Sequence, residues 1–210
     1  MDAGEVTIGL NELTSTWLDD AQADFSSLIK PHSFEFDLSW SGCLFPGDVL
    51  LEAACVSQLY ASGANFERAL KMTQTNFHGM LFSHECQFDG DVIADEAFFR
   101  VGLDVRFSKF AGDVSFHQAK FGHHVRLSSV HFMRNADFSH SRFSGYSDFQ
   151  NSQFDRDVSF YGARFEHETN FRAMRIGWNA NFKAVQSNLS IQLPRRHLID
   201  CNSGALLISH

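Results

Sequence analysis

The chain has 210 residues, a formal net charge of −8 and a large excess of phenylalanine, with 23 Phe against three Pro. No apolar run reaches the roughly 18 residues of a membrane-spanning helix, so we expect no membrane contact. The four Cys show neither CxxC pairing nor the density of a disulfide framework, which favours reduced thiols and a cytoplasmic location.

The charges are unevenly distributed along the chain. Ten of the 25 acidic residues, but only Lys30 of the 17 basic residues, fall in residues 1–60. The remainder is close to neutral and has no broad basic field, so direct nucleic-acid binding is not expected. The first ten residues have no basic stretch ahead of an apolar run, and we expect no signal peptide.

Residues 1–33 contain one amphipathic segment. Leu13 to Leu28 follows a helical period, with Thr14 or Ser15 available as an N-cap. Its apolar face is formed by Trp17, Ala21, Phe25 and Leu28. We interpret residues 1–33 as an N-terminal cap that is partly helical.

The centre of the chain is a repeat with a period of eleven residues. The first series is Phe66, Phe77, Phe88, Phe99, Phe110, Phe121, Phe132, Phe143, Phe154 and Phe165, followed by Ile176. The second series is Phe116, Leu127, Phe138, Phe149, Phe160, Phe171 and Phe182. Together they advance by five and six residues alternately. A fixed short period over this length indicates a stacked-repeat architecture.

The intervening residues favour strands over a long helix. A step of five or six residues rotates an α-helix by roughly 120–140°, which would split the Phe into two stripes. A small or β-branched residue stands two positions before most large ones, as in Val114 before Phe116 and Ala119 before Phe121. Residues two apart point to the same side of an extended chain, so each unit directs a small and a large side chain inward.

Units such as Gly-Asp-Val-Ser-Phe at 112–116 and Arg-Asp-Val-Ser-Phe at 156–160 resemble the pentapeptide-repeat family, in a Phe-centred variant with alternating five- and six-residue units. The resemblance covers residues 34–187. It implies an all-β fold, a right-handed four-sided parallel β-helix of about seven coils, with roughly 22 residues to a coil. Residues 188–210 would then be a C-terminal cap or dimerisation segment.

Stacking the units four to a coil predicts four inward columns. The first is Phe45, Phe66, Phe88, Phe110, Phe132, Phe154 and Ile176; the second is Leu51, Lys71, Ile93, Phe116, Phe138, Phe160 and Phe182. The third is Val56, Phe77, Phe99, Phe121, Phe143 and Phe165; the fourth is Trp40, Ala61, Phe82, Val105, Leu127, Phe149 and Phe171.

Two places do not fit these columns. Lys71 is unsuited to a buried position, so we expect Leu70 or Met72 to turn inward in an irregular coil over 56–72. The step order changes between Phe99 and Phe110, which predicts a bulge or loop around Val105.

No constellation typical of an enzyme, metal site or cofactor site is found. Asp48, Asp113 and Asp157 recur at one corner, with Asn135 and Asn179 in equivalent places. They are interpreted as caps of backbone N–H groups rather than as a cation ladder. The His residues do not share a column, and Cys43 and Cys86 fall at small inward positions. We therefore expect no catalysis, no metal and no cofactor.

Outward positions offer a candidate partner surface. Lys120, Arg142 and Arg164 precede their Phe at intervals of 22 and predict a basic row, which either meets a partner or serves as solvated charge. Arg100 lies close to this row. Phe98 and Phe107 fall at outward positions and would either join a contact patch or turn inward.

The apolar residues after Pro194 suggest a role for the C-terminal tail. Leu198, Leu206, Leu207 and Ile208 would either cap the last coil or form a homodimer with a second copy.

Two functions remain open from the sequence. The first is a non-enzymatic, rigid scaffold that binds a protein partner. The second follows from the resemblance, since some family members mimic duplex DNA, bind DNA gyrase or topoisomerase IV, and protect it from quinolones or toxins. A continuous acidic face would favour the mimic, and a basic or mixed face the scaffold.

Overall fold

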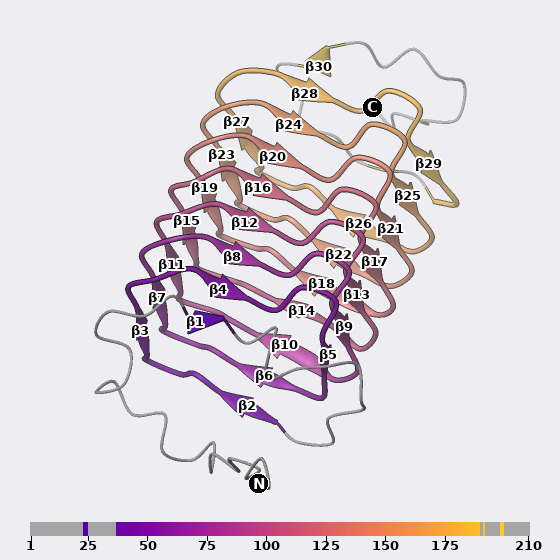
Figure 1. The fold of residues 1–210 in the computed structure, drawn as a ribbon. Helices are drawn as coiled ribbons and strands as arrows, with labels where there is room; N and C mark the ends of the chain where they lie inside the picture. Colours follow the sequence, from indigo (N-terminus) through magenta and orange to yellow (C-terminus); the bar gives the residue numbers. More distant parts are fainter. Residues whose placement is uncertain (1–22, 25–36, 190, 192–197, 200–210) are drawn as a thin grey trace, which may run out of the picture.

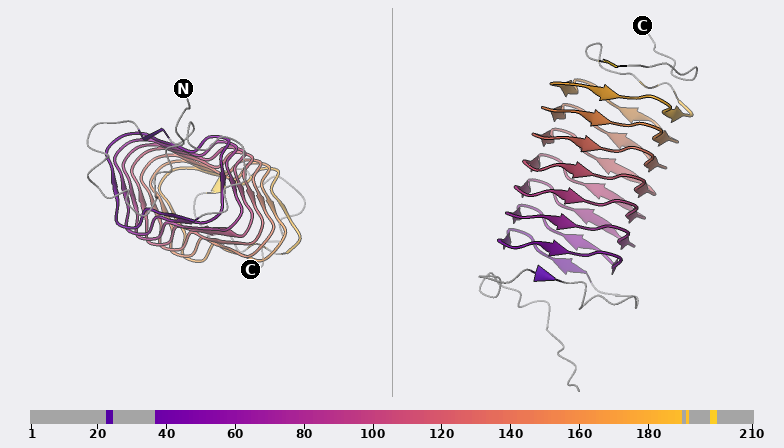
Figure 2. Two further views of the ribbon diagram at one scale, coloured as in Figure 1. Left: turned by 60° about the horizontal axis from the view of Figure 1, so that its bottom comes forward. Right: turned by 45° about the horizontal axis from the view of Figure 1, so that its top comes forward.

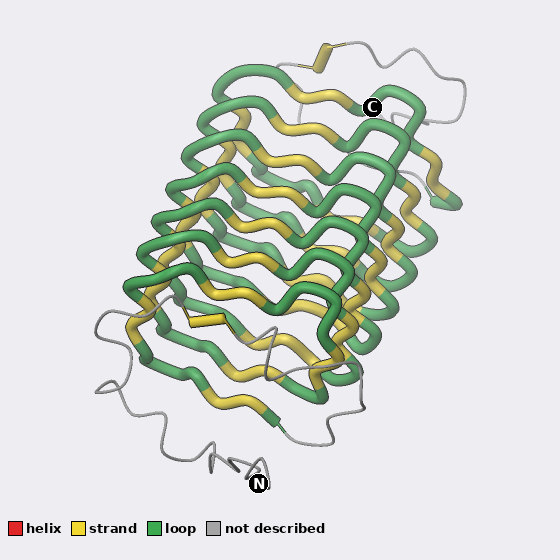
Figure 3. The backbone as a smooth tube through the Cα atoms, in the orientation of Figure 1, coloured by secondary structure: helices red, strands yellow, loops and turns green. Residues whose placement is uncertain are grey.

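The computed structural model describes residues 23–24, 37–189, 191 and 198–199, and there the chain forms a stack of about seven coils (Figure 1). Each coil adds one short strand to each of four parallel sheets. Seen end on, the coils have a four-sided outline (Figure 2). The described residues contain strands, turns and loops but no helix (Figure 3). The predicted all-β solenoid with four parallel sheets is thus confirmed.

We number the four faces of the solenoid in the order in which the chain crosses them within each coil, starting from Leu38. Face 1 consists of β2 (Leu38–Ser39), β6 (Leu59–Tyr60), β10 (Met80–Phe82), β14 (Gly102–Asp104), β18 (His124–Arg126), β22 (Ser147–Asp148) and β26 (Thr169–Asn170). Face 2 consists of β3 (Leu44–Phe45), β7 (Asn65–Phe66), β11 (Gln87–Phe88), β15 (Lys109–Phe110), β19 (His131–Phe132), β23 (Gln153–Phe154) and β27 (Arg175–Ile176).

The other two faces follow in each coil. Face 3 consists of β1 (Ala23–Asp24), β4 (Val49–Leu50), β8 (Leu70–Lys71), β12 (Val92–Ile93), β16 (Val114–Ser115), β20 (Ala136–Asp137), β24 (Val158–Ser159), β28 (Ala180–Asn181) and β30 (Leu198–Ile199). Face 4 consists of β5 (Cys55–Val56), β9 (Asn76–Phe77), β13 (Phe98–Phe99), β17 (Lys120–Phe121), β21 (Arg142–Phe143), β25 (Arg164–Phe165) and β29 (Gln186–Ser187).

The alternation of five and six residues reflects two kinds of corner. The five-residue step from Phe116 to Phe121 crosses a tight turn, in which the N–H of Ala119 donates to the carbonyl of Phe116 at 3.0 Å and Gln118 has a φ of 56°. A positive φ at the third turn residue is the mark of a type II turn. The same turn recurs where face 1 meets face 2. The six-residue steps cross the other two corners, which are wider.

The first coil is one residue shorter than the others. Phe45 pairs with Phe66 across 21 residues, whereas Phe110 pairs with Phe132 across 22. The missing residue lies between faces 4 and 1, where Ser57 and Gln58 alone connect β5 to the inward Leu59. The irregularity predicted over 56–72 is therefore a single deletion at this corner.

The interior is filled by stacked Phe rings. On face 2, the centroids of Phe110 and Phe132 are 5.0 Å apart with an interplanar angle of 9°, and those of Phe132 and Phe154 are 4.6 Å apart. On face 4, Phe121 and Phe143 stack at 4.8 Å. All five rings are buried. The predicted columns of faces 2 and 4 are confirmed in full.

The predicted columns of faces 1 and 3 are wrong at Ile93 and Phe82, which point outward, and the buried residues are Ala94 and Ser83, each one position later. At Lys71 the expectation is confirmed, because Leu70 and Met72 are the buried residues there. The size of the residues explains the error, because in these coils the large inward residues stand two positions before the column positions and not at them. They are Leu59, Leu70, Leu81, Val92 and Leu103. In the pairs Leu81 and Ser83, and Val92 and Ala94, the larger inward side chain comes first and the smaller one second, the reverse of the usual order. The volume that each unit fills therefore stays similar.

The bulge or loop predicted near Val105 is also absent. Strand β14 pairs without interruption with β10 and β18, Gly102 lying opposite Met80 and His124. The apparent shift arose from placing Phe82 in the column. Once Ser83 takes that place, Val105 and Leu127 follow at regular intervals of 22.

Both ends of face 3 carry one further short strand. Ala23–Asp24 pairs with Val49–Leu50, and Leu198–Ile199 pairs with Ala180–Asn181. At Ala23 and Asp24 the structure therefore has a strand where a helix was expected. The rest of the expected helical cap, like Leu206, Leu207 and Ile208, lies outside the described residues.

Candidate interaction faces

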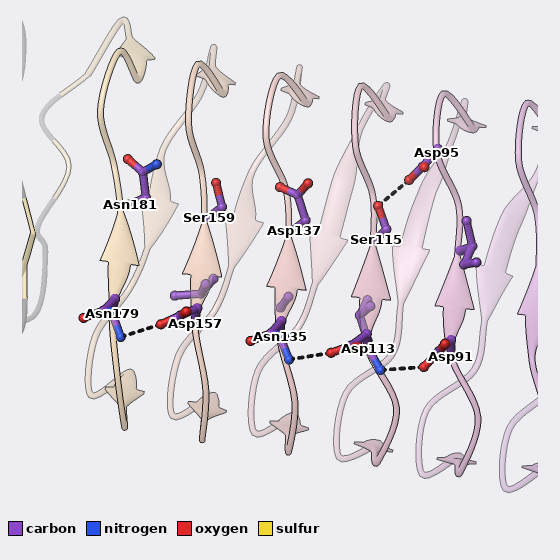
Figure 4. Close-up of a pocket in the computed structure, with 14 residues that line it drawn as sticks. Asp91, Asp95, Asp113, Ser115, Asn135, Asp137, Asp157, Ser159, Asn179 and Asn181 are labelled. Carbon is purple, nitrogen blue, oxygen red and sulfur yellow. Dashed lines mark hydrogen bonds between the residues drawn. The ribbon is translucent and has the colours of Figure 1, made fainter.

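Face 3 carries a shallow acidic groove with a volume of about 610 Å³ (Figure 4). One row of polar side chains precedes the strands and contains Asp91, Asp113, Asn135, Asp157 and Asn179. A second row lies on the strands and contains Ser115, Asp137, Ser159 and Asn181. Asp95 lies beside this second row. Among the described residues that line the groove there is no Lys or Arg, so it carries five negative charges without a basic partner inside it.

The Asp residues of the first row cap the backbone of the coil that follows. Oδ1 of Asp91 accepts from the N–H of Asp113 at 2.9 Å, and Oδ1 of Asp113 accepts from the N–H of Asn135 at 3.0 Å. Asp157 caps Asn179 in the same way at 3.1 Å. The predicted capping role is confirmed for Asp113 and Asp157, and for Asp48, whose Oδ1 accepts from the N–H of Ala69 at 3.1 Å. Asp91, Asp113 and Asp157 each use one carboxylate oxygen for the fold and present the other to the groove.

The second row is held by side-chain contacts near the corner with face 4. Asp95 accepts hydrogen bonds from the Ser115 hydroxyl and, at 3.2 Å, from the N–H of His117. Nδ1 of His117 lies 2.8 Å from Oγ of Ser139 and 3.8 Å from Oδ2 of Asp137. The carboxylates of Asp95 and Asp137 are therefore fixed in position as well.

An exposed aromatic residue borders the groove near its C-terminal end. Trp178 is 57% exposed, and the guanidinium of Arg156 lies 4.6 Å from the centroid of its ring. The residues that follow these two, Asp157 and Asn179, belong to the groove. This edge thus combines a large apolar surface with the acidic row.

Face 4 carries the predicted basic row. Lys120, Arg142 and Arg164 lie on adjacent strands in direct register, and Phe98 precedes them in the same ladder. All three basic side chains are exposed.

Glu166 compensates much of this row, which sequence reasoning missed. Its Oε1 lies 3.0 Å from Nη2 of Arg142 and 3.1 Å from Nε of Arg164. Partial burial would raise the pKa of Glu166, but the hydrogen bond and charge of Arg142, with the charge of Arg164, bring it below its ordinary value. Glu166 is therefore ionised at neutral pH, and Lys120 is the member of the row without an ion pair in the described structure.

The two outward Phe do not form one patch. Phe98 is half-buried on face 4, with the guanidinium of Arg100 5.5 Å from its ring centroid. Phe107 is 60% exposed at the corner between faces 1 and 2, on the far side of the coil from Phe98. Both point outward, which is one of the two alternatives that the sequence left open, but they belong to separate surfaces.

A buried carboxylate stands beside Phe107, and nothing in the repeat pattern pointed to it. The side chain of Asp104 is 2% exposed on the outer surface of face 1. It accepts from Nε of Arg106 at 2.9 Å and from Nη2 at 2.8 Å, and Nη1 of Arg126 lies 3.5 Å away. Burial would raise the pKa of Asp104, but the hydrogen bonds and charge of Arg106 and the charge of Arg126 hold it below its ordinary value.

The described part of the chain contains no cluster of three His, Cys, Asp or Glu suited to a metal ion. Within the described residues there is also no helix that could cross a membrane. Cys86 is buried as expected, and burial raises the pKa of its thiol to about 11. Of the tail residues considered for dimerisation, Leu198 belongs to β30.

Comparison with known protein families gives one match. Residues 127–175 match the model for pentapeptide repeats in nine copies. No curated protein and no solved structure gives a significant match. The matched segment covers strands β19 to β26, and the four parallel sheets continue on both sides of it. Residues 127–175 therefore belong to the pentapeptide-repeat family, and they are part of a β-solenoid with a Phe-rich buried core.

Proposed function

We propose that the protein is a non-enzymatic scaffold that binds a protein partner through the acidic groove of face 3. The observation that carries this proposal is the segregation of charge, because five groove carboxylates face solvent with no basic residue among them. Members of the family are generally non-catalytic. The solenoid interior is occupied by stacked Phe, so specificity must come from the outer surface.

The groove is well suited to a basic protein surface. Asp91, Asp113 and Asp157 are immobilised by their capping bonds, so binding costs little side-chain entropy at these positions. Their outer oxygens recur with the coils along the rod. Charge of one sign in fixed positions steers an oppositely charged partner and fixes its orientation. The acidic face also repels nucleic acid, which favours a protein partner in the cytoplasm.

Replacing three Asp by Asn separates the capping role of these residues from their negative charge. The side-chain oxygen of Asn can accept the same backbone hydrogen bond as that of Asp, so Asp91→Asn, Asp113→Asn and Asp157→Asn should keep the caps and remove three charges. Proteins would be recovered from the native host with the wild-type chain, DNA gyrase being scored among them, and the purified partner titrated. We expect the triple variant to bind about tenfold more weakly or worse, with an unchanged melting temperature.

The matched control lies on face 4. Lys120→Gln, Arg142→Gln and Arg164→Gln together remove the basic row, which the sequence suggested as the contact. Glutamine is preferable to glutamate here, because reversal would place further carboxylates beside Glu166. If the control loses affinity and the face 3 variant does not, the contact lies on face 4.

The second candidate function is mimicry of duplex DNA toward DNA gyrase. The acidic groove of face 3 supports it, because a mimic needs negative charge repeated along its length. The basic row of face 4 limits the mimicry to one side of the rod. A supercoiling assay with purified gyrase and a quinolone tests it. We expect protection by the wild-type chain and its loss in the triple Asn variant; no effect of the wild-type chain on gyrase would exclude this candidate.

A further inference from the structure

The corner between faces 1 and 2 holds an aromatic residue in a conformation that suits it poorly. Phe107 has a φ of 60° and is 60% exposed. The left-handed region is unfavourable for a bulky residue. The other left-handed turn residues of the described coils are Gly, Ala, Ser, Asn, Gln, Glu or His. Phe107 therefore costs backbone strain and recovers little of it by burial, so the fold does not account for its presence.

The residue before Phe107 is held rigidly. The guanidinium of Arg106 binds the buried Asp104 carboxylate through Nε and Nη2, and the Arg106 side chain remains 38% exposed. Arg126 supports the same carboxylate. On the other side of the turn, Lys109 is exposed and has no ion pair in the described structure. An exposed aromatic ring thus stands between an immobilised arginine and a lysine.

We propose that Phe107 is an anchor residue for a protein partner with an apolar pocket for a phenyl ring and an acidic rim facing Arg106 and Lys109. Aromatic and arginine side chains dominate binding energy at protein interfaces, particularly where they are preorganised. The charge of the rim follows from the two cations that flank the ring. The proposal rests on the protein-binding function above and adds a contact on a different corner from the acidic groove.

The backbone strain at Phe107 leads to a prediction that differs from the one expected if the ring stabilised the fold. Phe107→Asn places a residue tolerant of the left-handed region in the turn, so we expect the melting temperature to rise by about 2–4 °C. A fall in the melting temperature would show that the ring serves the fold, and would overturn the proposal. Ala173→Asn, at the equivalent turn three coils later, is the matched control.

Photo-crosslinking in native-host cells tests the contact itself. The photoreactive residue p-benzoylphenylalanine would replace Phe107, Ala173 or, in the face 3 groove, Ser159. We expect a crosslinked protein at position 107 and none above background at position 173. That protein, once purified, should bind Phe107→Asn at least about tenfold more weakly than wild type, and Ala173→Asn as well as wild type.

The outcomes separate this inference from the proposed function. No specific crosslink at position 107, or equal affinity of the purified partner for Phe107→Asn, would overturn the anchor. A crosslink at position 159 in the same experiment would still support the acidic groove. A crosslink at 107 without one at 159 would support the anchor and count against the groove.

Discussion

Single residues of this solenoid divide into those that fill the coil and those that face outward, and the sequence revealed the first group more readily. Stacked Phe such as Phe132 and Phe154 stand out because no other role explains their spacing. Small inward residues such as Ser83 and Ala94 were missed, because a larger apolar residue stood next to each. Asp104 could not be foreseen, because its burial depends on Arg106 and Arg126 closing over it.

Truncating a stacked ring should be costly. Phe138 is fully buried between Phe116 at 5.4 Å and Phe160 at 5.0 Å. We expect Phe138→Ala to lower the free energy of unfolding by roughly 3–5 kcal/mol, from lost transfer energy and the cavity left behind. Urea titration measures the change. The outward Phe98→Ala is the control, and a cost for Phe138→Ala no larger than that of the control would contradict the filled core.

Acid should weaken the fold partly through Asp104. Its pKa in the folded state lies below its unfolded value, so ionised Asp104 stabilises the fold above the unfolded pKa. That stabilisation is lost as the pH falls through the folded pKa. Urea titrations at about pH 6 and about pH 3 should show a smaller acid-induced loss for Asp104→Asn than for wild type. Equal losses in the two proteins would remove Asp104 from the explanation.

At the scale of the element, the corners determine how the repeat is read. Five-residue steps cross type II turns, whose Gln118 and His140 have positive φ, and six-residue steps cross the wider corners. The sequence predicted this alternation because the Phe spacing records it directly. It did not predict the acidic groove of face 3, because the acids and bases of residues 61–210 nearly cancel when they are counted together.

The shortened corner of the first coil should accept a residue. Later coils have one more residue between faces 4 and 1, so one Gly inserted between Ser57 and Gln58 should change the free energy of unfolding by less than about 1 kcal/mol. A Gly inserted between Gln118 and Ala119 breaks a type II turn and displaces the register of the next strand, and should cost several times more. Thermal unfolding compares the two, and similar losses would contradict the assigned deletion.

At the scale of the whole molecule, a solenoid must protect its ends. Among the described residues, β26, β27 and β29 end their sheets with one side unpaired, and only face 3 continues to β30. Unpaired strand edges promote association with other chains. The tail beyond Pro194 contains the apolar run Leu206, Leu207 and Ile208, so we propose that two copies associate through their C-terminal ends about a two-fold axis.

Light scattering distinguishes this dimer from a monomer. We expect the full chain to have about twice its monomer mass of 23.7 kDa. A chain ending at Leu193 should have the mass of one copy of that shorter chain. Loss of the tail removes the residues proposed to join the two copies. A full-length mass near 23.7 kDa that does not change on dilution would exclude the dimer.

The central claim is that the carboxylates of face 3 guide and bind a partner while the Phe core only supports them. Its most direct test is the association rate constant of the purified partner, measured by stopped flow over a range of salt concentrations. For the wild-type chain the rate should fall steeply with salt, and Asp91→Asn, Asp113→Asn and Asp157→Asn together should remove most of that dependence. An equally steep salt dependence in the triple variant would contradict the claim.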